Sequence, residues 1–173
     1  MESKQRQFEA LVTAYSSDLY RYAYWMCHNA ALAEDLVQET FLRAWKSIES
    51  LRDYQLAKSW LITILRRETA RYFERHDKPD TSLEDINLNS MVFATREPDH
   101  SDVFILRQGL AQLSDEYREV LLLQVVAGFS CDEIATQLAI KPGAVMTRLF
   151  RARQKLRNWY EDHDGSLAER KVE

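Results

Sequence analysis

The sequence predicts an all-α protein made of two small helical domains joined by a flexible linker. Apolar residues recur at helical spacing along most of the 173 residues, and only four glycines and three prolines interrupt them. The pattern is lost in one acidic stretch, residues 77–101, which divides the chain. We therefore expect a three-helix bundle over 1–76, a linker over 77–101, a four-helix domain over 102–160 and a polar, frayed tail over 161–173.

Three amphipathic helices account for the first domain. The first is marked by apolar residues three and four positions apart: Phe8, Leu11, Val12, Tyr15, Leu19, Tyr22, Ala23 and Met26. It should end near Asn29. A second helix should follow over about 31–48, a looser segment over 49–56, and a third helix over about 58–75. Together these helices can bury one core.

The linker is predicted from charge and from proline. Acidic residues far outnumber basic ones here: Asp77, Asp80, Glu84, Asp85, Glu97, Asp99 and Asp102 stand against Lys78 and Arg96, with Pro79 and Pro98 between them. Such a composition is typical of a solvated connection between domains.

The second domain contains helix boundaries that can be read directly. Apolar periodicity returns at Val103, and Ser114 is positioned to cap the next helix. Ser130 and Glu133 have the spacing of a capping box, in which each side chain satisfies a free amide at a helix start. The helix behind them should break over 139–141 and restart at Pro142, whose fixed φ suits a first helical position.

The last of these helices is basic, although the chain has a net charge of -4. Residues 137–159 contain six Lys and Arg side chains and no acidic one. Val145, Leu149, Ala152 and Leu156 form an apolar stripe toward the core and leave the opposite face free. Two helices joined by a tight turn, the second one basic, favour a helix-turn-helix that binds DNA. The alternative is a solvated basic helix without a ligand.

Other classes of site find little support. Cys27 and Cys131 are far apart and inside predicted helices, which indicates reduced, buried thiols rather than a disulfide. The four histidines lack partners at metal-ligand spacing, so we expect no metal and no cofactor. Neither a signal peptide nor a long apolar run is present, which favours a cytoplasmic protein. A regulatory use of Cys131 stays open.

Two long motifs resemble one family. Residues 33–45 (AEDLVQETFLRAW) are similar to region 2.2 of the extracytoplasmic-function (ECF) sigma factors, promoter-specificity subunits of bacterial RNA polymerase. Residues 128–135 (GFSCDEIA) and 143–153 (GAVMTRLFRAR) resemble region 4.2 of that family. The resemblance extends from about Leu11 to Arg157. It implies recruitment of core polymerase to promoters rather than catalysis, and a partner anti-sigma factor that is often anchored in a membrane.

The resemblance also implies a polymerase-binding face in the first domain. Asp35, Gln38 and Glu39 share one side of a helix and are expected to dock on the coiled coil of the polymerase β′ subunit. Phe41 and Trp45 are expected to support that helix from the core. The second domain is expected to contact the β flap. The alternative for Asp35, Gln38 and Glu39 is a solvated acidic face without a partner. An enzyme active site is not favoured, because no nucleophile or metal ligand accompanies these residues.

Two DNA-binding sets follow from the same resemblance. The minus-10 element is expected to contact Arg52, Tyr54, Lys58, Trp60, Arg66, Arg67, Arg71, Tyr72 and Arg75, because phosphates attract cations and unstacked bases stack on aromatic rings. Trp60 could equally be a core residue. The minus-35 element is expected to contact Lys141, Met146, Thr147, Arg148, Phe150, Arg151, Arg153 and Lys155.

The chain departs from the family at four positions. Arg67 and Arg71 stand where the family commonly has Asn and Asp, and Ala144 and Met146 stand where Thr and a basic residue are common. Base preferences at either element are therefore not transferred. Two other functions stay open on sequence alone: a helix-turn-helix regulator that binds its operator without polymerase, and an interaction protein that titrates polymerase or a regulator.

Overall fold

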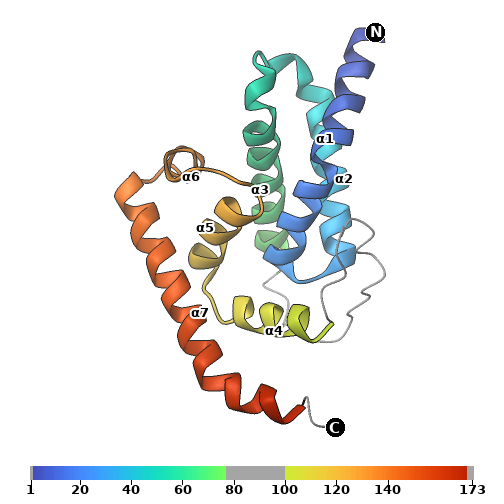
Figure 1. The fold of residues 1–173 in the computed structure, drawn as a ribbon. Coiled ribbons are helices and arrows are strands. Elements are labelled where there is room, and N and C mark those ends of the chain that lie inside the picture. Colours follow the sequence, from blue (N-terminus) through green and yellow to red (C-terminus); the bar gives the residue numbers. More distant parts are fainter. Residues whose placement is uncertain (1, 77–99, 171–173) are drawn as a thin grey trace. The chain divides into compact units, whose positions relative to one another are not determined.

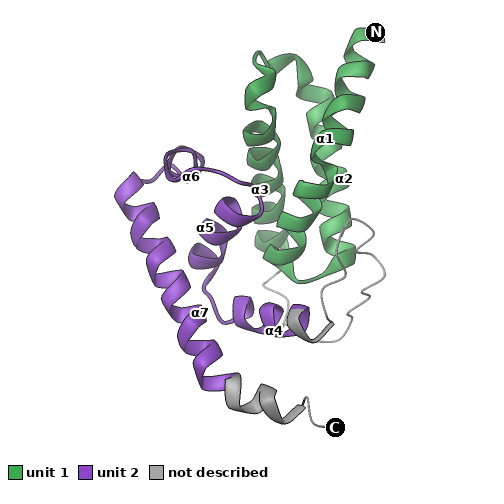
Figure 2. Cartoon of the chain, in the orientation of Figure 1, with its two compact units in different colours: residues 1–94 green, residues 95–173 purple. Residues whose placement is uncertain are grey.

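The computed structural model describes residues 2–76 and 100–170, and in these ranges every regular element is helical. The chain divides into two compact units, residues 1–94 and residues 95–173 (Figure 2). The all-α prediction is therefore confirmed. Of the predicted linker, residues 77–99 lie outside the described residues, and its last two positions belong to the first helix of the second unit.

The described residues of unit 1, 2–76, form three helices in the predicted order (Figure 1). They are α1 (Glu2–Cys27), α2 (Ala30–Ser47) and α3 (Ala57–Arg75). The segment expected to be looser holds two short 3-10 turns, Ile48–Ser50 and Tyr54–Leu56. Asn29 caps α2, because its side-chain oxygen accepts a hydrogen bond of 2.9 Å from the Leu32 amide.

The three helices of unit 1 pack against one another pairwise. Their apolar faces form a core of Leu19, Tyr22, Ala23, Ala33, Leu36, Ala44, Leu61, Ile62 and Leu65. A second cluster lies between the start of α1 and the 3-10 turns. It consists of Leu11, Ile48, Leu51 and Ala57, with Phe8, Tyr15 and Trp60 packed against it. Apolar burial on this scale is what fixes the exposed faces of α2 and α3 in place.

Between residues 100 and 170, unit 2 forms four helices. They are α4 (His100–Ala111), α5 (Asp115–Val125), α6 (Cys131–Leu138) and α7 (Pro142–Arg170). Its core includes Leu110, Leu113, Val120, Leu123, Ile134, Val145, Leu149 and Ala152. The stripe predicted for the basic helix is therefore confirmed, with Leu156 half-buried at its far end.

The turn between α4 and α5 is organised by a buried guanidinium rather than by the predicted cap. Ser114 occupies the N-cap position, but its side chain makes no capping hydrogen bond. Arg118 donates to the Leu110 carbonyl at 3.1 Å and to the Leu113 carbonyl at 2.9 Å. It thereby satisfies the Leu113 carbonyl in the turn and gives the Leu110 carbonyl, at the end of α4, a second donor beside the Leu113 amide.

Two further expectations differ from the structure. The helix α7 continues to Arg170, where the sequence predicted a frayed tail after Trp159. Because no glycine or proline occurs between Trp159 and Gly165, nothing in the chain obliges the helix to end after Trp159. Cys27 and Cys131 are free thiols, as expected, but both are half-exposed rather than buried because they lie at helix ends.

Candidate nucleic-acid and protein interfaces

The helix-turn-helix of unit 2 is built by local hydrogen bonds that the sequence specifies. The Glu133 amide donates to Ser130 Oγ at 3.2 Å, and the Ser130 amide donates to Glu133 Oε2 at 2.8 Å, which is the predicted capping box. At the other end, Ala139 adopts a left-handed conformation with φ of 54°. The Ile140 amide then bonds the Ala135 carbonyl at 3.0 Å, so α6 ends and α7 restarts at Pro142.

We expect this capping box to weaken in acid. The Ser130 backbone amide, and after it the Ser130 hydroxyl, hold the pKa of Glu133 below its ordinary value of 4.5. A carboxyl whose pKa is lower in the folded than in the unfolded state adds stability above the unfolded value, and this contribution is lost as pH falls through the folded value. The midpoint of thermal unfolding should therefore be higher for wild type than for Glu133→Gln at pH 7. This difference in midpoint should disappear below about pH 4. A gap of the same size at both pH values would contradict this role of Glu133.

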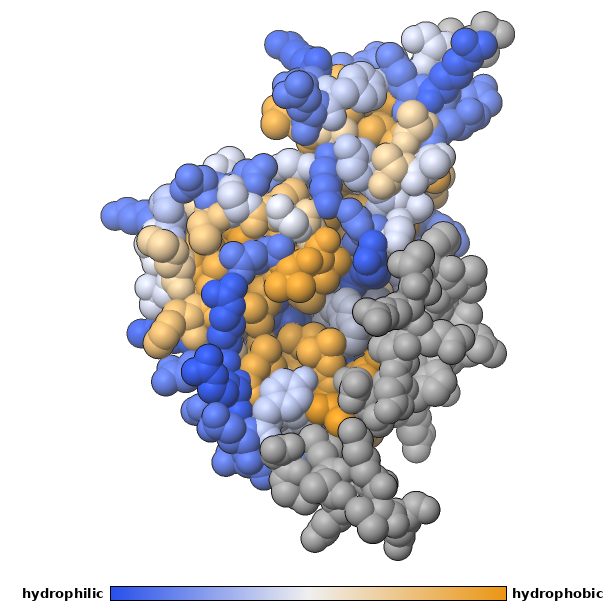
Figure 3. Space-filling view, viewed as in Figure 1, coloured by the Kyte–Doolittle hydropathy of each residue, from blue (hydrophilic) through white to orange (hydrophobic). Residues whose placement is uncertain are grey.

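The free face of α7 combines apolar and cationic groups. Met146 and Phe150 are 57% and 66% exposed, and Arg151 is exposed beside them. Figure 3 shows a band of hydrophilic side chains along α7 with hydrophobic residues exposed next to it. Thr147 lies on the same face, although its hydroxyl donates to the Gly143 carbonyl at 3.0 Å. Such a mixture can contact thymine methyl groups, base edges and phosphates.

Three cations of α7 are held by α5. Arg148 Nη2 lies 3.5 Å from Glu116 Oε2. Arg153 donates a hydrogen bond to Gln124, and Lys155 Nζ lies 5.2 Å from the centre of the Tyr117 ring. The sequence predicts that all three side chains contact DNA, and spacing along one helix gives no sign of contacts from another helix. Lys141, at the turn, is exposed.

A pocket of about 270 Å³ opens between α5, α6 and the free face of α7. Its lining combines apolar and cationic side chains: Gln124, Cys131, Met146, Leu149, Phe150, Arg153, Gln154 and Arg157. The pocket thus places the thiol of Cys131 next to the predicted DNA-binding face.

The predicted polymerase-binding residues lie on α2 as expected from their spacing. Asp35 and Gln38 are exposed, and Glu39 is half-buried. Phe41 and Trp45 contact α1 rather than the main core: their rings lie 6.0 and 5.1 Å from that of Phe8. Trp45 is also 38% exposed and has Lys4 Nζ above it at 5.2 Å. These two aromatic residues therefore support α2 from its outer edge.

The predicted minus-10 residues fall into two groups. Those that are exposed are Arg52, Tyr54, Arg67, Arg71 and Arg75. Those that are half-buried are Lys58, Trp60, Arg66 and Tyr72. Lys58 Nζ lies 2.7 Å from Asp18 Oδ2, and the Tyr72 ring stacks on His76 with centroids 4.3 Å apart. Trp60 packs against the second cluster of unit 1, which favours the structural role over a DNA contact.

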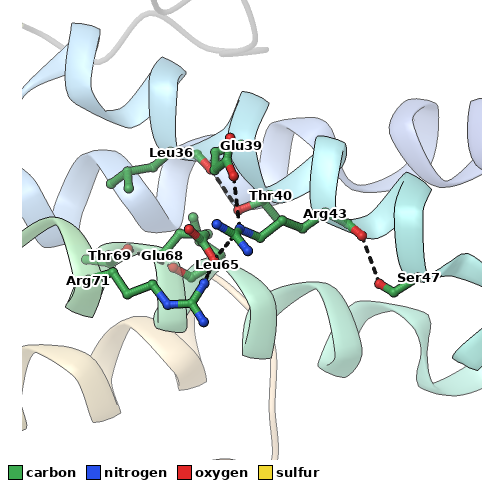
Figure 4. Close-up of polar contacts among 9 residues, drawn as sticks. All are labelled: Leu36, Glu39, Thr40, Arg43, Ser47, Leu65, Glu68, Thr69 and Arg71. Atoms are coloured by element: carbon green, nitrogen blue, oxygen red, sulfur yellow. Dashed lines mark hydrogen bonds and ion pairs between the residues drawn. The ribbon is translucent and has the colours of Figure 1, made fainter.

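A charged cluster that sequence reasoning missed joins α2 to α3 (Figure 4). Glu68 is only 6% exposed, and its Oε1 lies 2.6 Å from Arg43 Nε and 2.8 Å from Arg71 Nη1. Arg43 Nε also lies 2.9 Å from Glu39 Oε1. The i,i+3 spacing of Glu68 and Arg71 and the i,i+4 spacing of Glu39 and Arg43 could have indicated two of these three pairs. The pair between the two helices had no signal in the sequence.

No group of three His, Cys, Asp or Glu residues within the described ranges is arranged to hold a metal ion. Across the same ranges, no helix has the length and apolar character needed to cross a membrane.

Comparison with known proteins defines the class. The family model for sigma-70 region 2 matches residues 11–78, and that for sigma-70 region 4 matches residues 104–156. The chain is 33% identical over 148 residues to the ECF RNA polymerase sigma factor SigM of Bacillus subtilis, covering 84% of this chain and 90% of SigM. It is 35% identical over 161 residues to SigL of Mycobacterium tuberculosis, covering 86% of this chain and 85% of SigL.

Solved structures share the fold. The sigma factor RpoE of Bartonella quintana, in complex with the anti-sigma factor NepR, has a TM-score of 0.70 at 24% identity, covering 93% of this chain and 98% of that one. CnrH in complex with the cytosolic domain of CnrY has a TM-score of 0.68 at 24% identity, covering 91% and 90%.

Regions 2 and 4 in one all-α chain define a sigma-70 type transcription initiation factor. More narrowly, the chain belongs to the ECF sigma factors, as the resemblance of its two motifs predicted. It is thus an alternative sigma factor that directs transcription initiation, and sigma factors are not enzymes in themselves.

Proposed function

We propose that this chain binds core RNA polymerase through the exposed face of α2 and directs it to promoters that α3 and α7 recognise. The observation that carries the proposal is the presence of regions 2 and 4 in a single chain whose relatives match it over most of their length. SigM and SigL, which this chain matches over 90% and 85% of their lengths, are both sigma factors. This favours a sigma factor function over that of an operator-binding regulator that works without polymerase.

We assign minus-35 recognition to the start of α7. Helices of this kind enter the major groove with their N-terminal residues toward the bases. Met146 and Phe150 can meet thymine methyl groups, and Arg151 can reach a base edge or a phosphate. Lys141, Thr147, Arg148, Arg153 and Lys155 extend the contact along the backbone.

We assign minus-10 recognition to α3 and the 3-10 turns before it. Exposed cations at positions 52, 67, 71 and 75 suit the backbone of a melted strand, and Tyr54 and Tyr72 can stack on its bases. Since the chain has a net charge of -4, its acidic residues repel phosphate, and we expect the isolated chain to bind duplex DNA poorly. Polymerase is therefore needed for tight promoter binding.

The partners follow from the same assignment. Asp35, Gln38 and Glu39 are proposed to dock on the β′ coiled coil, and unit 2 on the β flap. An anti-sigma factor that is anchored in a membrane is proposed as a further partner, because a sigma factor of the same fold was solved in complex with the anti-sigma factor NepR. The protein would act in the cytoplasm, where polymerase and promoters are, without an enzymatic activity or a cofactor.

Run-off transcription tests the proposal. Purified core polymerase is supplied with sheared genomic DNA, with and without this chain. New discrete transcripts that depend on the chain are expected, and their start sites give the promoters directly. Core binding without transcripts would point to a titrating protein, and DNA binding without any core binding would point to an independent regulator. Either result would overturn the proposal.

A further inference from the structure

We propose that Glu68 controls how far Arg71 is available to promoter DNA, and that polymerase contact at Glu39 releases Arg71. In this arrangement Glu68 and Arg43 are positioning residues between the polymerase-facing helix α2 and the DNA-facing helix α3. The inference rests on the proposed function, because it takes α2 as the polymerase face and α3 as the minus-10 face.

The geometry places four charges in a row. Glu39, Arg43, Glu68 and Arg71 alternate in sign, and the Arg43 side chain lies between the two carboxylates (Figure 4). A single oxygen, Glu68 Oε1, is shared by Arg43 at 2.6 Å and Arg71 at 2.8 Å. Both cations therefore compete for the same acceptor.

Burial decides which member of the row can leave. The Glu68 side chain is 6% exposed, so its charge is strongly disfavoured without a partner. The Arg71 side chain is 48% exposed and can turn to solvent or to a phosphate at little cost. Arg43 can stay behind as the partner of Glu68, because it reaches that carboxylate from α2.

Arg43 is divided between its two partners. Its Nε lies within ion-pair distance of both Glu39 and Glu68, yet among the described residues this buried atom has no partner with hydrogen-bond geometry. If a cation of the polymerase takes the Glu39 carboxylate, Arg43 is left to Glu68 alone. The hold of Glu68 on Arg71 then weakens, and Arg71 becomes free for a DNA phosphate. The family commonly has Asp at the position of Arg71. This use of an arginine would therefore be confined to chains that, like this one, have Arg in place of that Asp.

The first test measures DNA binding by the free, full-length chain. The probe is a fluorescein-labelled single-stranded oligonucleotide at low salt, read by anisotropy. Glu68→Gln should raise affinity about threefold to fivefold, because an amide holds Arg71 less strongly than a carboxylate. In the Arg71→Ala background the same change should have no effect. Glu74→Gln on the same helix is the matched control for lost negative charge, and an equal gain there would overturn the proposal.

A second variant leaves the buried carboxylate intact. Glu39→Gln imitates the engagement of Glu39 by polymerase and should raise affinity for the same oligonucleotide, whereas Glu34→Gln on the same helix should not. The gain should disappear when Glu68→Gln is already present, because coupled residues are not additive. Additive effects of Glu39→Gln and Glu68→Gln would contradict this relay, the proposed coupling from Glu39 through Arg43 and Glu68 to Arg71. If Glu68→Gln is less stable to heat, all affinities are measured at low temperature.

One further variant separates this inference from the proposed function. Arg67 is exposed on α3 and takes no part in the row. If Arg67→Ala leaves oligonucleotide binding unchanged, α3 does not contact DNA and the minus-10 assignment itself fails. If Arg67→Ala weakens binding while Glu68→Gln and Glu39→Gln change nothing, the assignment stands and the relay is wrong.

Discussion

Replacing Arg148 and Arg151 together by Ala should lower promoter-specific transcription by about thirtyfold or more. A cation that contacts a base edge or a phosphate contributes about 1–3 kcal/mol, and both residues lie on the face of α7 that we assign to the major groove. The measurement is run-off transcription by reconstituted holoenzyme on a promoter found with the wild-type chain. Core polymerase binding should not change.

The control for this variant carries the same loss of charge elsewhere. Arg6 and Arg21 are exposed on α1, and the double change to Ala there should leave promoter choice and transcript yield close to wild type. Thermal unfolding of both double variants checks that unit 2 remains folded. If transcription by the α7 variant equals that of the α1 variant, the start of α7 is not the minus-35 reader.

Reversing the charge of Asp35 should weaken binding to core polymerase by about thirtyfold or more. Removing one partner of a desolvated charge pair at an interface costs about 2–5 kcal/mol. Asp35→Arg also adds repulsion toward a cationic partner, and because Asp35 is exposed on α2 the larger side chain can be accommodated in solvent. The dissociation constant of labelled chain and core polymerase is the quantity to measure.

The neighbouring residue supplies the comparison. Glu34→Arg makes the same charge change on the same helix, one position from Asp35, at an exposed residue outside the predicted docking set Asp35, Gln38 and Glu39. Its affinity for core polymerase should stay within a few-fold of wild type. Equal loss in both variants would indicate a general charge effect, and unchanged affinity in Asp35→Arg would refute the docking face.

The helices could be predicted because their signals are local. The stripe from Val145 to Ala152, the capping box of Ser130 and the restart at Pro142 each depend on spacing within a few residues, and the structure contains all three. The family followed from two motifs that are also contiguous. The predicted end of α7 near Trp159 was wrong, because a polar composition alone does not stop a helix.

The remaining differences concern contacts between helices. Nothing near Glu68 in sequence announces Arg43, and nothing near Lys155 announces Tyr117. A one-dimensional pattern indicates which face of a helix is buried, but it does not reveal which polar residue of a neighbour meets that face. The same limit explains why Trp45 was expected in the core and lies partly exposed against Phe8.

The three contacts that α5 makes with cations of α7 differ in what they leave for DNA. Gln124 and Tyr117 are neutral, so they restrict the rotamers of Arg153 and Lys155 while the full positive charge of each remains. Ordering such a side chain on binding costs about 0.5–1.5 kcal/mol, and here much of that entropy is already lost when unit 2 folds. Glu116 is acidic and competes with phosphate for Arg148. Helix α5, which has no assigned DNA contact, thereby lowers the entropic cost of promoter binding at Arg153 and Lys155. At Arg148 it adds an enthalpic cost, because the ion pair with Glu116 must be broken.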